Sequence, residues 1–138
     1  MEREILFRGK CCDIGLWYEG MPVRASDSPY RICAIDIPEK RTCVLVDPET
    51  VGQYTGLTDK NGKKIFEGDI LDLAALMITD FGVVKYGEYK DSDMRDDIPC
   101  GHVGFYVDIE EQHYNYVRRD ILFFVSRCKV VGNVYDRR

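Results

Sequence analysis

The sequence lacks the signatures that mark the commonest functional classes. No stretch of its 138 residues approaches the ~20 consecutive apolar residues of a membrane-spanning helix, so we expect no membrane association. It contains neither a P-loop (GxxxxGK[ST]) nor a GxGxxG dinucleotide-binding motif. A GxSxG nucleophile motif is also absent, and the only histidines, His102 and His113, do not stand beside a serine or cysteine in a recognisable arrangement. The sequence therefore indicates a protein that is not an enzyme and makes a small hydrolase the least favoured interpretation.

Six cysteines are present, but their spacing suits neither a zinc site nor a disulfide framework. Cys11 and Cys12 are adjacent, and no CxxC pair exists to preorganise a zinc tetrahedron. We therefore expect no metal and no cofactor. The start of the sequence lacks the apolar segment of a secretory signal, so we expect a cytoplasmic protein with reduced thiols. A hairpin around residue 40 could still set Cys33 opposite Cys43.

Positive charge is in deficit, which disfavours nucleic-acid binding. The chain has 19 basic and 24 acidic side chains and a net charge of −5, so a phosphate backbone would be repelled unless the basic groups gather on one face. Nine tyrosines, six phenylalanines and one tryptophan could nevertheless stack on bases. A nucleic-acid-binding small β-barrel is therefore the alternative function, with Lys60, Lys63 and Lys64 as its most obvious basic cluster.

What the sequence does contain is a succession of short strand patterns separated by glycine and proline turns. Alternating or β-rich runs predict strands at residues 5–10, 15–20, 31–37, 42–46, 69–73, 81–86, 102–109 and 128–135. Polar or turn-forming residues predict loops at 22–30 and 88–101. Residues 74–79 could be helical by propensity, but the strand patterns on both sides leave little room, so a strand and turn is favoured there. Short helical turns are predicted at 48–53 and 120–126, with Asp120 as a candidate N-cap. These features indicate an all-β, mainly antiparallel fold with at most one or two short helical turns.

The most informative segment is a hairpin signal in the middle of the chain. Asn61-Gly62 is a dipeptide that accepts positive φ at both central positions of a type I′ turn. Polar residues flank this pair, and a second bend is predicted at Glu67-Gly68-Asp69. After that bend, the alternation of the next strand places Leu71 and Leu73 in the core.

This hairpin also carries a family resemblance. The segments QYTGL (53–57), DKNGK (59–63) and IFEGDI (65–70) resemble the YopX family of bacteriophage and prophage proteins, as do REILFRGK (3–10), GVVKY (82–86) and VGNVYD (131–136). The resemblance implies a β-rich, intracellular, phage-encoded protein, placed in the cytoplasm of a bacterial host. Because the family has no agreed biochemical activity, no catalytic residue carries over to this chain.

The matches run nearly end to end, so we expect one YopX-like domain over residues 1–138. The order of glycine bends and strands between residues 67 and 107 looks like that of small SH3-like barrels. This likeness suggests a subdivision into an N-terminal β extension or subdomain (1–50) and an SH3-like barrel (51–138).

The leading hypothesis is a non-catalytic, phage-derived accessory protein that binds another protein or assembles with itself. Open sheet edges and exposed aromatic side chains are means of such association. Candidate interaction residues are Trp17 and Tyr18, together with Lys60, Lys63 and Lys64 at the hairpin tip. We expect a homo-oligomer or a complex with a protein partner.

Overall fold

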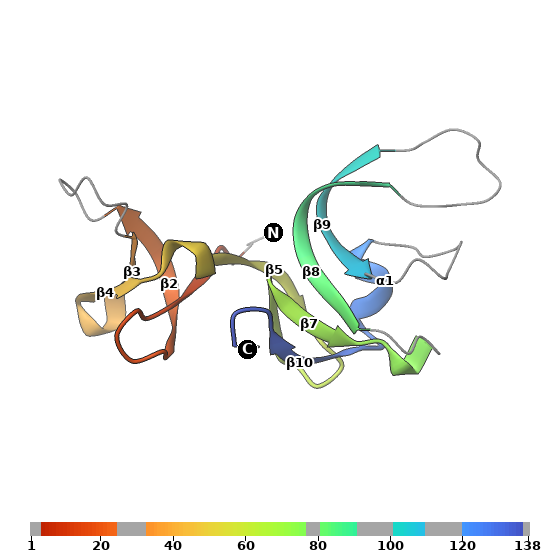
Figure 1. Cartoon of the computed structure of the whole chain (residues 1–138), viewed down its shortest axis with the longest axis horizontal. Helices are drawn as coiled ribbons and strands as arrows, with labels where there is room; N and C mark the ends of the chain where they lie inside the picture. The colour runs from red at the N-terminus through yellow and green to blue at the C-terminus, as the bar shows by residue number, and fades with distance from the viewer. Residues whose placement is uncertain (1–3, 25–32, 77–80, 91–100, 110–119, 137–138) are drawn as a thin grey trace. The chain divides into compact units, whose positions relative to one another are not determined.

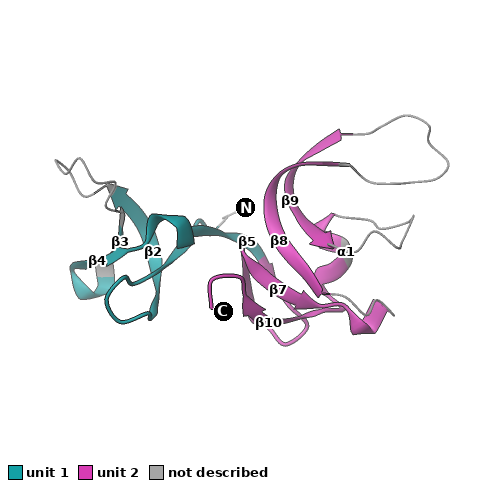
Figure 2. Ribbon diagram, in the orientation of Figure 1, with its two compact units in different colours: residues 1–56 teal, residues 57–138 magenta. Residues whose placement is uncertain are grey.

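The computed structural model describes residues 4–24, 33–76, 81–90, 101–109 and 120–136. Within these ranges the chain forms ten β-strands, and every strand pair recorded there is antiparallel. The all-β class expected from the alternating patterns is thereby confirmed. The strands fall into two compact units, Met1–Gly56 and Leu57–Arg138 (Figure 2). The boundary between them lies inside a strand, a few residues beyond the expected subdivision at residue 50.

Unit 1 contributes to an antiparallel sheet of six strands in the order β4-β3-β2-β1-β5-β6, in which β6 (Lys64–Phe66) belongs to unit 2. The strands of unit 1 are β1 (Phe7–Lys10), β2 (Trp17–Arg24), β3 (Cys33–Ile37), β4 (Thr42–Val46) and β5 (Gly52–Thr58). Figure 1 labels β2, β3, β4 and β5. The pairing of Lys10 with Trp17 confirms the expected opening hairpin, and the pairing of Ile35 with Val44 confirms the expected hairpin of the next two strands.

Small residues allow close packing in unit 1. Ile35 and Val46 are fully buried. Gly20 lies directly over β3, where an added Cβ would come 2.1 Å from the carbonyl oxygen of Asp36. No larger residue fits there without moving the backbone.

One expectation for unit 1 is wrong, and the strand register decides a cysteine arrangement that the sequence left open. Residues 22–24, expected in a loop, extend β2, and Pro22 pairs with Ile35. Proline is accommodated because β1 pairs with β2 only as far as Gly20, so the ladder on that side needs no N–H from Pro22. Cys43 lies opposite Asp36 and not opposite Cys33, because the register starts from the pair Ile37–Thr42.

Unit 2 contains a four-stranded antiparallel sheet with the order β10-β7-β8-β9, covered on one face by a short helix. Its elements are β6 (Lys64–Phe66), β7 (Asp69–Asp72), β8 (Phe81–Lys90), β9 (Gly101–Ile109), α1 (Ile121–Val125) and β10 (Lys129–Asn133). The core packs Phe124 of α1 against Leu71, Val84 and Val107 of the sheet, all fully buried, together with Leu73. The inward orientation predicted for Leu71 and Leu73 is confirmed.

The closed barrel expected for the second half is not confirmed. Four of the described strands of unit 2 make an open sheet in which β10 and β9 are the edges, whereas β6 belongs to the other sheet. The alternation of apolar and polar residues predicted the individual strands. Closure of a barrel also requires the first and last strands to pair, and this alternation does not specify which strands pair.

Helical turns are more numerous than the one or two expected. Besides α1, the described residues include the 3₁₀ turns η1 (Pro38–Lys40), η2 (Pro48–Thr50) and η3 (Ala74–Leu76). The turns expected at 48–53 and 120–126 are present. Asp47 caps η2 by accepting the N–H of Glu49, whereas Asp120 precedes α1 without a side-chain cap bond.

The loop expected at 88–101 is shorter than predicted. β8 continues to Lys90 and β9 begins at Gly101, so Glu88 and Val103 form a cross-strand pair. Residues 91–100 lie outside the described ranges, as do residues 25–30 of the other predicted loop and residues 77–79 of the predicted strand and turn.

Candidate interaction surfaces

The two predicted aromatic candidates lie in unit 1 and are half-buried. Trp17 begins β2, and its ring lies 4.7 Å from the guanidinium carbon of Arg8, within the range of a cation–π contact. Tyr18 pairs with Gly9. Both side chains are therefore less exposed than their sequence context suggests.

The three predicted lysines lie in unit 2, on and beside the turn between β5 and β6. Lys60 and Lys63 are exposed and Lys64 is half-buried. The structure thus brings the lysines together as a group, but it places them in a different unit from Trp17 and Tyr18.

The turn that carries these lysines is organised by the carboxylate of Asp59. Its Oδ1 accepts the backbone N–H groups of Asn61 and Lys63, each at 2.9 Å, and its Oδ2 accepts the N–H of Val130 at 2.9 Å. Asp59 is buried although it is charged. A buried carboxylate is stable when several N–H groups donate to it, as they do here.

This arrangement replaces the predicted type I′ turn. Gly62 has a φ of 81°, but Asn61 has no positive φ, and the N–H of Gly62 donates to the carbonyl of Asp59 at 3.0 Å. The result is a three-residue loop that ends in a left-handed glycine. The side chain of Asp59 favours it by holding both ends of the loop.

The pKa of Asp59 reflects the same contacts. Burial by itself would raise the pKa of this carboxyl group. Hydrogen bonds from the N–H groups of Val130, Lys63 and Asn61, with the charge of Lys63, outweigh burial and hold the pKa below its ordinary value. The carboxylate is therefore ionised at neutral pH and acts as a structural acceptor.

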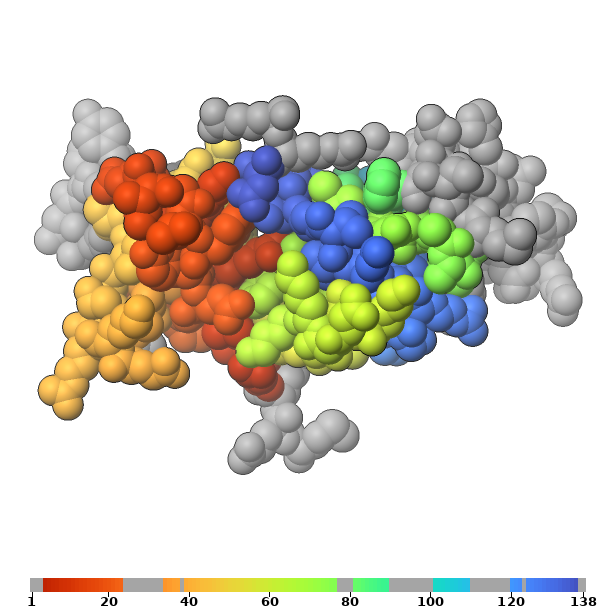
Figure 3. Space-filling view, turned by 90° about the horizontal axis from the view of Figure 1, so that it is seen from below, coloured from red at the N-terminus to blue at the C-terminus, as the bar shows by residue number. Residues whose placement is uncertain are grey.

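The Asp59 contacts also assemble a larger basic cluster than the sequence pattern indicates. The N–H of Lys60 donates to the carbonyl of Cys128 at 3.1 Å, which brings the turn next to the exposed side chains of Arg127 and Lys129. Figure 3 shows the yellow-green hairpin residues beside the blue C-terminal residues on this face. We call Lys60, Lys63, Arg127 and Lys129 the basic cluster.

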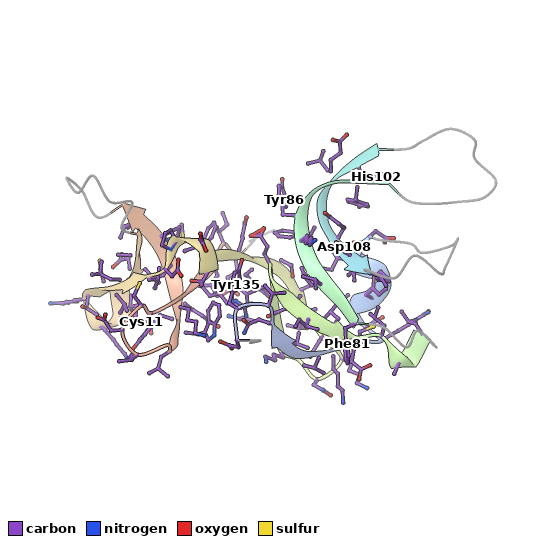
Figure 4. All side chains as sticks on the ribbon, viewed as in Figure 1. Cys11, Phe81, Tyr86, His102, Asp108 and Tyr135 are labelled. Carbon is purple, nitrogen blue, oxygen red and sulfur yellow. The ribbon has the colours of Figure 1, made fainter. Side chains whose placement is uncertain are left out.

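A second surface is formed by aromatic side chains on both faces of the β8–β9 hairpin. On the face that continues from the core, Tyr86 and Phe105 meet edge to face at 5.0 Å, and Val103 is 73% exposed. On the opposite face, the ring of Tyr89 lies 5.2 Å from those of both Tyr106 and His102. Tyr86 and His102 are labelled on this hairpin in Figure 4.

The strand β9 is also an edge of the sheet. It pairs with β8 along its whole length. On its other side, the part of the chain that the structure describes contributes one isolated bridge, between Tyr106 and Asp120. An edge strand presents backbone N–H and C=O groups to which another strand can pair.

The third feature is a pocket of about 340 Å³ in unit 2. It is lined by Ile70 of β7, Phe81 of β8, Val131, Gly132 and Asn133 of β10, and Asp136. The buried amide of Asn133 fixes the turn at one end: its Nδ2 donates to Asp136 Oδ2 at 2.7 Å, and its Oδ1 accepts the N–H groups of Tyr135 and Asp136 at 3.0 Å. The residues that line the pocket are mostly apolar, and Asp136 contributes one carboxylate.

The described residues were also compared with the requirements of a metal site, a reactive thiol and a membrane-spanning helix. The described residues hold no group of three His, Cys, Asp or Glu side chains that could bind a metal ion, and His113 lies outside them. Burial, followed by the charge of Asp72, raises the pKa of the Cys128 thiol, so this cysteine stays protonated at neutral pH. No helix within the described ranges has the length and apolar character to cross a membrane.

Sequence reasoning missed both the β9 edge and the pocket. The aromatic side chains of the β8–β9 hairpin could have been found from the sequence, because they all fall in or beside predicted strands. They are Tyr86, Tyr89, His102, Phe105 and Tyr106. The pocket had none, because three strands distant in sequence must meet to form it.

Comparison with known families gives a match over nearly the whole chain. The family described as YopX protein matches residues 7–137, nearly the whole chain. The chain belongs to the YopX family. The match covers both units, so the YopX assignment concerns the whole fold and not a hairpin inserted into an unrelated protein. Comparison with curated proteins found none that matches.

Proposed function

We propose that this YopX-family chain is a non-catalytic, phage-derived accessory protein that binds an extended segment of another protein, or of a second copy, along β9. The observation that carries the proposal is the combination of an edge strand with exposed apolar side chains around it. β9 is the last strand of the sheet that the described residues form, and Val103 on β9 and Tyr86 on the adjacent β8 are 73% and 57% exposed.

The physical basis is strand addition. An incoming segment that pairs with β9 gains main-chain hydrogen bonds, and its alternating side chains contact the two faces of the hairpin. Tyr86, Phe105 and Val103 offer an apolar surface on one face, and Tyr89 and Tyr106 an aromatic one on the other. The same edge can pair with its equivalent in a second copy, which gives a homo-oligomer.

The family context supports the biological part of the proposal. A YopX protein of phage type would act in the cytoplasm of the bacterial host, where the partner is a host or phage protein. The predicted contact residues Trp17 and Tyr18 are half-buried, so the proposal places the contact on β9 and the adjoining aromatic side chains instead.

Two matched variants test the proposal. Val103→Lys puts a lysine on the β9 edge, a device that blocks edge pairing, whereas Leu122→Lys makes the same change on the exposed face of α1, where Leu122 is 67% exposed. Tagged wild-type and variant proteins are expressed in the host, and captured proteins are quantified by mass spectrometry. Light scattering of each pure protein at micromolar concentration measures self-association.

We expect the wild type and Leu122→Lys to retain the same captured partner or the same oligomer mass, and Val103→Lys to lose it. If Val103→Lys keeps the complex unchanged, strand addition at β9 is wrong. Monomers of 16.0 kDa in all three proteins, with no partner captured, would contradict the proposal as well.

A second candidate function, nucleic-acid binding, is favoured by one observation. The Asp59 turn gathers the four members of the basic cluster, although the net charge of −5 opposes a long polyanion. Fluorescence anisotropy with labelled DNA and RNA across a salt series tests it. Binding at low salt that weakens in a Lys60→Glu, Lys63→Glu double variant would support this function, and absence of binding at the lowest salt would remove it.

A further inference from the structure

The pocket of unit 2 has walls of two kinds. Ile70 and Val131 supply aliphatic surface from β7 and β10, and Phe81 supplies an aromatic ring that is 48% exposed. Asp136 is the only charged residue among the lining residues that the structure describes. Figure 4 labels Phe81, which begins β8.

The carboxylate of Asp136 is held in place by the turn that contains it. Asn133 Nδ2 donates to its Oδ2 at 2.7 Å, and the N–H of Asp136 donates to the Oδ1 of Asn133. Asn133 is itself buried, and the N–H of Val134 donates to the carbonyl of Gly68 at 3.0 Å. A carboxylate fixed in this way loses little side-chain entropy when it binds a ligand.

This combination of groups is suited to an organic cation with an apolar stem. Aliphatic walls accept methylene groups, an aromatic face attracts a cation, and a carboxylate accepts its hydrogen bonds. The volume of about 340 Å³ is at the lower end of the range of ligand pockets and suits one side chain or a small amine.

The neighbouring charges are compatible with a cationic ligand. On β10, Lys129 lies outside the lining of the pocket and is the cross-strand neighbour of Asp72. Among the described lining residues Asp136 carries the charge, and the net charge of −5 favours cations over anions at longer range.

We propose that this pocket binds an alkyl ammonium or alkyl guanidinium group, the chemistry of a lysine or arginine side chain. Such a group can come from a peptide or from a free small amine. The inference does not depend on strand addition at β9, because the pocket and β9 involve different residues.

The test compares three probes with the same stem: hexylammonium, hexanol and hexanoate, each titrated into ¹⁵N-labelled full-length protein and followed by NMR. We expect hexylammonium to give saturable shifts at the amides of Gly132, Asn133 and Asp136, and hexanoate to give none. Hexanol should bind more weakly at the same amides. Equal affinity for all three probes, or shifts elsewhere in the protein, would overturn the proposal.

Two variants separate the contributions of the pocket. Asp136→Asn should weaken hexylammonium binding by about threefold, the range of an exposed ion pair, and leave hexanol unchanged. Phe81→Leu keeps the apolar wall but should reduce the preference for hexylammonium over hexanol. Spectra of each variant without probe verify that it is folded. If both variants bind hexylammonium like the wild type, the carboxylate and the ring do not form the site.

A capped tripeptide, acetyl-Gly-Arg-Gly-amide, distinguishes the sources of the cation, with acetyl-Gly-Gln-Gly-amide as control. Binding of the arginine peptide as tight as that of hexylammonium identifies a peptide side chain as the ligand. Binding of hexylammonium alone identifies a free amine. Failure of both cationic probes would refute the inference and leave the β9 proposal unaffected.

Discussion

The carboxylate of Asp59 accepts a hydrogen bond from the backbone N–H of Val130, 71 positions further along the chain, at 2.9 Å. The same carboxylate holds the N–H groups of Asn61 and Lys63 in the hairpin turn. One buried side chain therefore shapes the turn and attaches it to the edge strand β10, and the basic cluster exists because of this attachment.

Removing this acceptor should cost much of the stability of the protein. Asp59→Ala leaves the N–H group of Val130 and two turn N–H groups without their carboxylate, and we expect the free energy of unfolding to fall by about 3 kcal/mol. Urea titration followed by circular dichroism measures the change. Glu39→Ala, at an exposed position, is the control and should change stability by less than about 0.5 kcal/mol. A similar small effect for both variants would refute the structural role of Asp59.

The stabilisation by Asp59 should depend on pH with a defined sign. Its pKa is lower in the folded protein than the value of about 3.9 in the unfolded chain, so the ionised carboxylate stabilises the fold above that pH. The contribution is lost as pH falls through the unfolded-state pKa towards the folded-state pKa. The difference in unfolding free energy between wild type and Asp59→Asn should therefore shrink between about pH 5 and pH 3. A difference that stays constant over this interval would contradict the prediction.

Glu67 should show the opposite dependence. Burial raises the pKa of its carboxyl group, so its contribution favours folding below the unfolded-state pKa and is lost as pH rises through the folded-state pKa. Glu67→Gln should consequently be more stable than the wild type at pH 7, by less than about 1 kcal/mol, and the gain should vanish below about pH 4. Thermal unfolding at pH 7 and pH 4 tests this, and a gain of equal size at both values would be the wrong result.

Two glycines in unit 2 should respond differently to alanine. Gly68 has a φ of 90°, and an added Cβ would lie 3.1 Å from Cε2 of Tyr135. Gly68→Ala should therefore cost about 2 kcal/mol of stability. Gly104 has neither a positive φ nor any atom within 4 Å of an added Cβ, so Gly104→Ala should be tolerated. Equal melting temperatures of the two variants would count against this explanation of the bend at Gly68.

Local pattern predicted much of the fold. Alternation located most strands, and Leu71 and Leu73 are buried as expected because the strand period by itself assigns their face. The presence of a turn at Asn61-Gly62 was predicted, but its type was not, because Asp59 selects the turn through contacts that include Val130 of a distant strand. Closure into an SH3-like barrel was expected by analogy, and the described strands form an open sheet.

The candidate sites were predicted less well than the fold. Lys60 and Lys63 are exposed as a tip should be, but their association with Arg127 and Lys129 requires a tertiary hydrogen bond. The edge position of β9 follows from the order of strands in the sheet, which no single segment specifies. The pocket likewise depends on how β7, β8 and β10 meet.

The central claim is that β9 pairs with an added strand, and amide hydrogen exchange across residues 101–109 tests it most directly. Exchange is measured by mass spectrometry for the free protein and for its complex with the partner or with a second copy. The complex to be used is the one that the Leu122→Lys variant retains and the Val103→Lys variant loses. We predict that exchange in this segment slows by at least about tenfold in the complex, while peptides from unit 1 are unchanged. A complex in which β9 exchanges as fast as in the free protein would contradict the account.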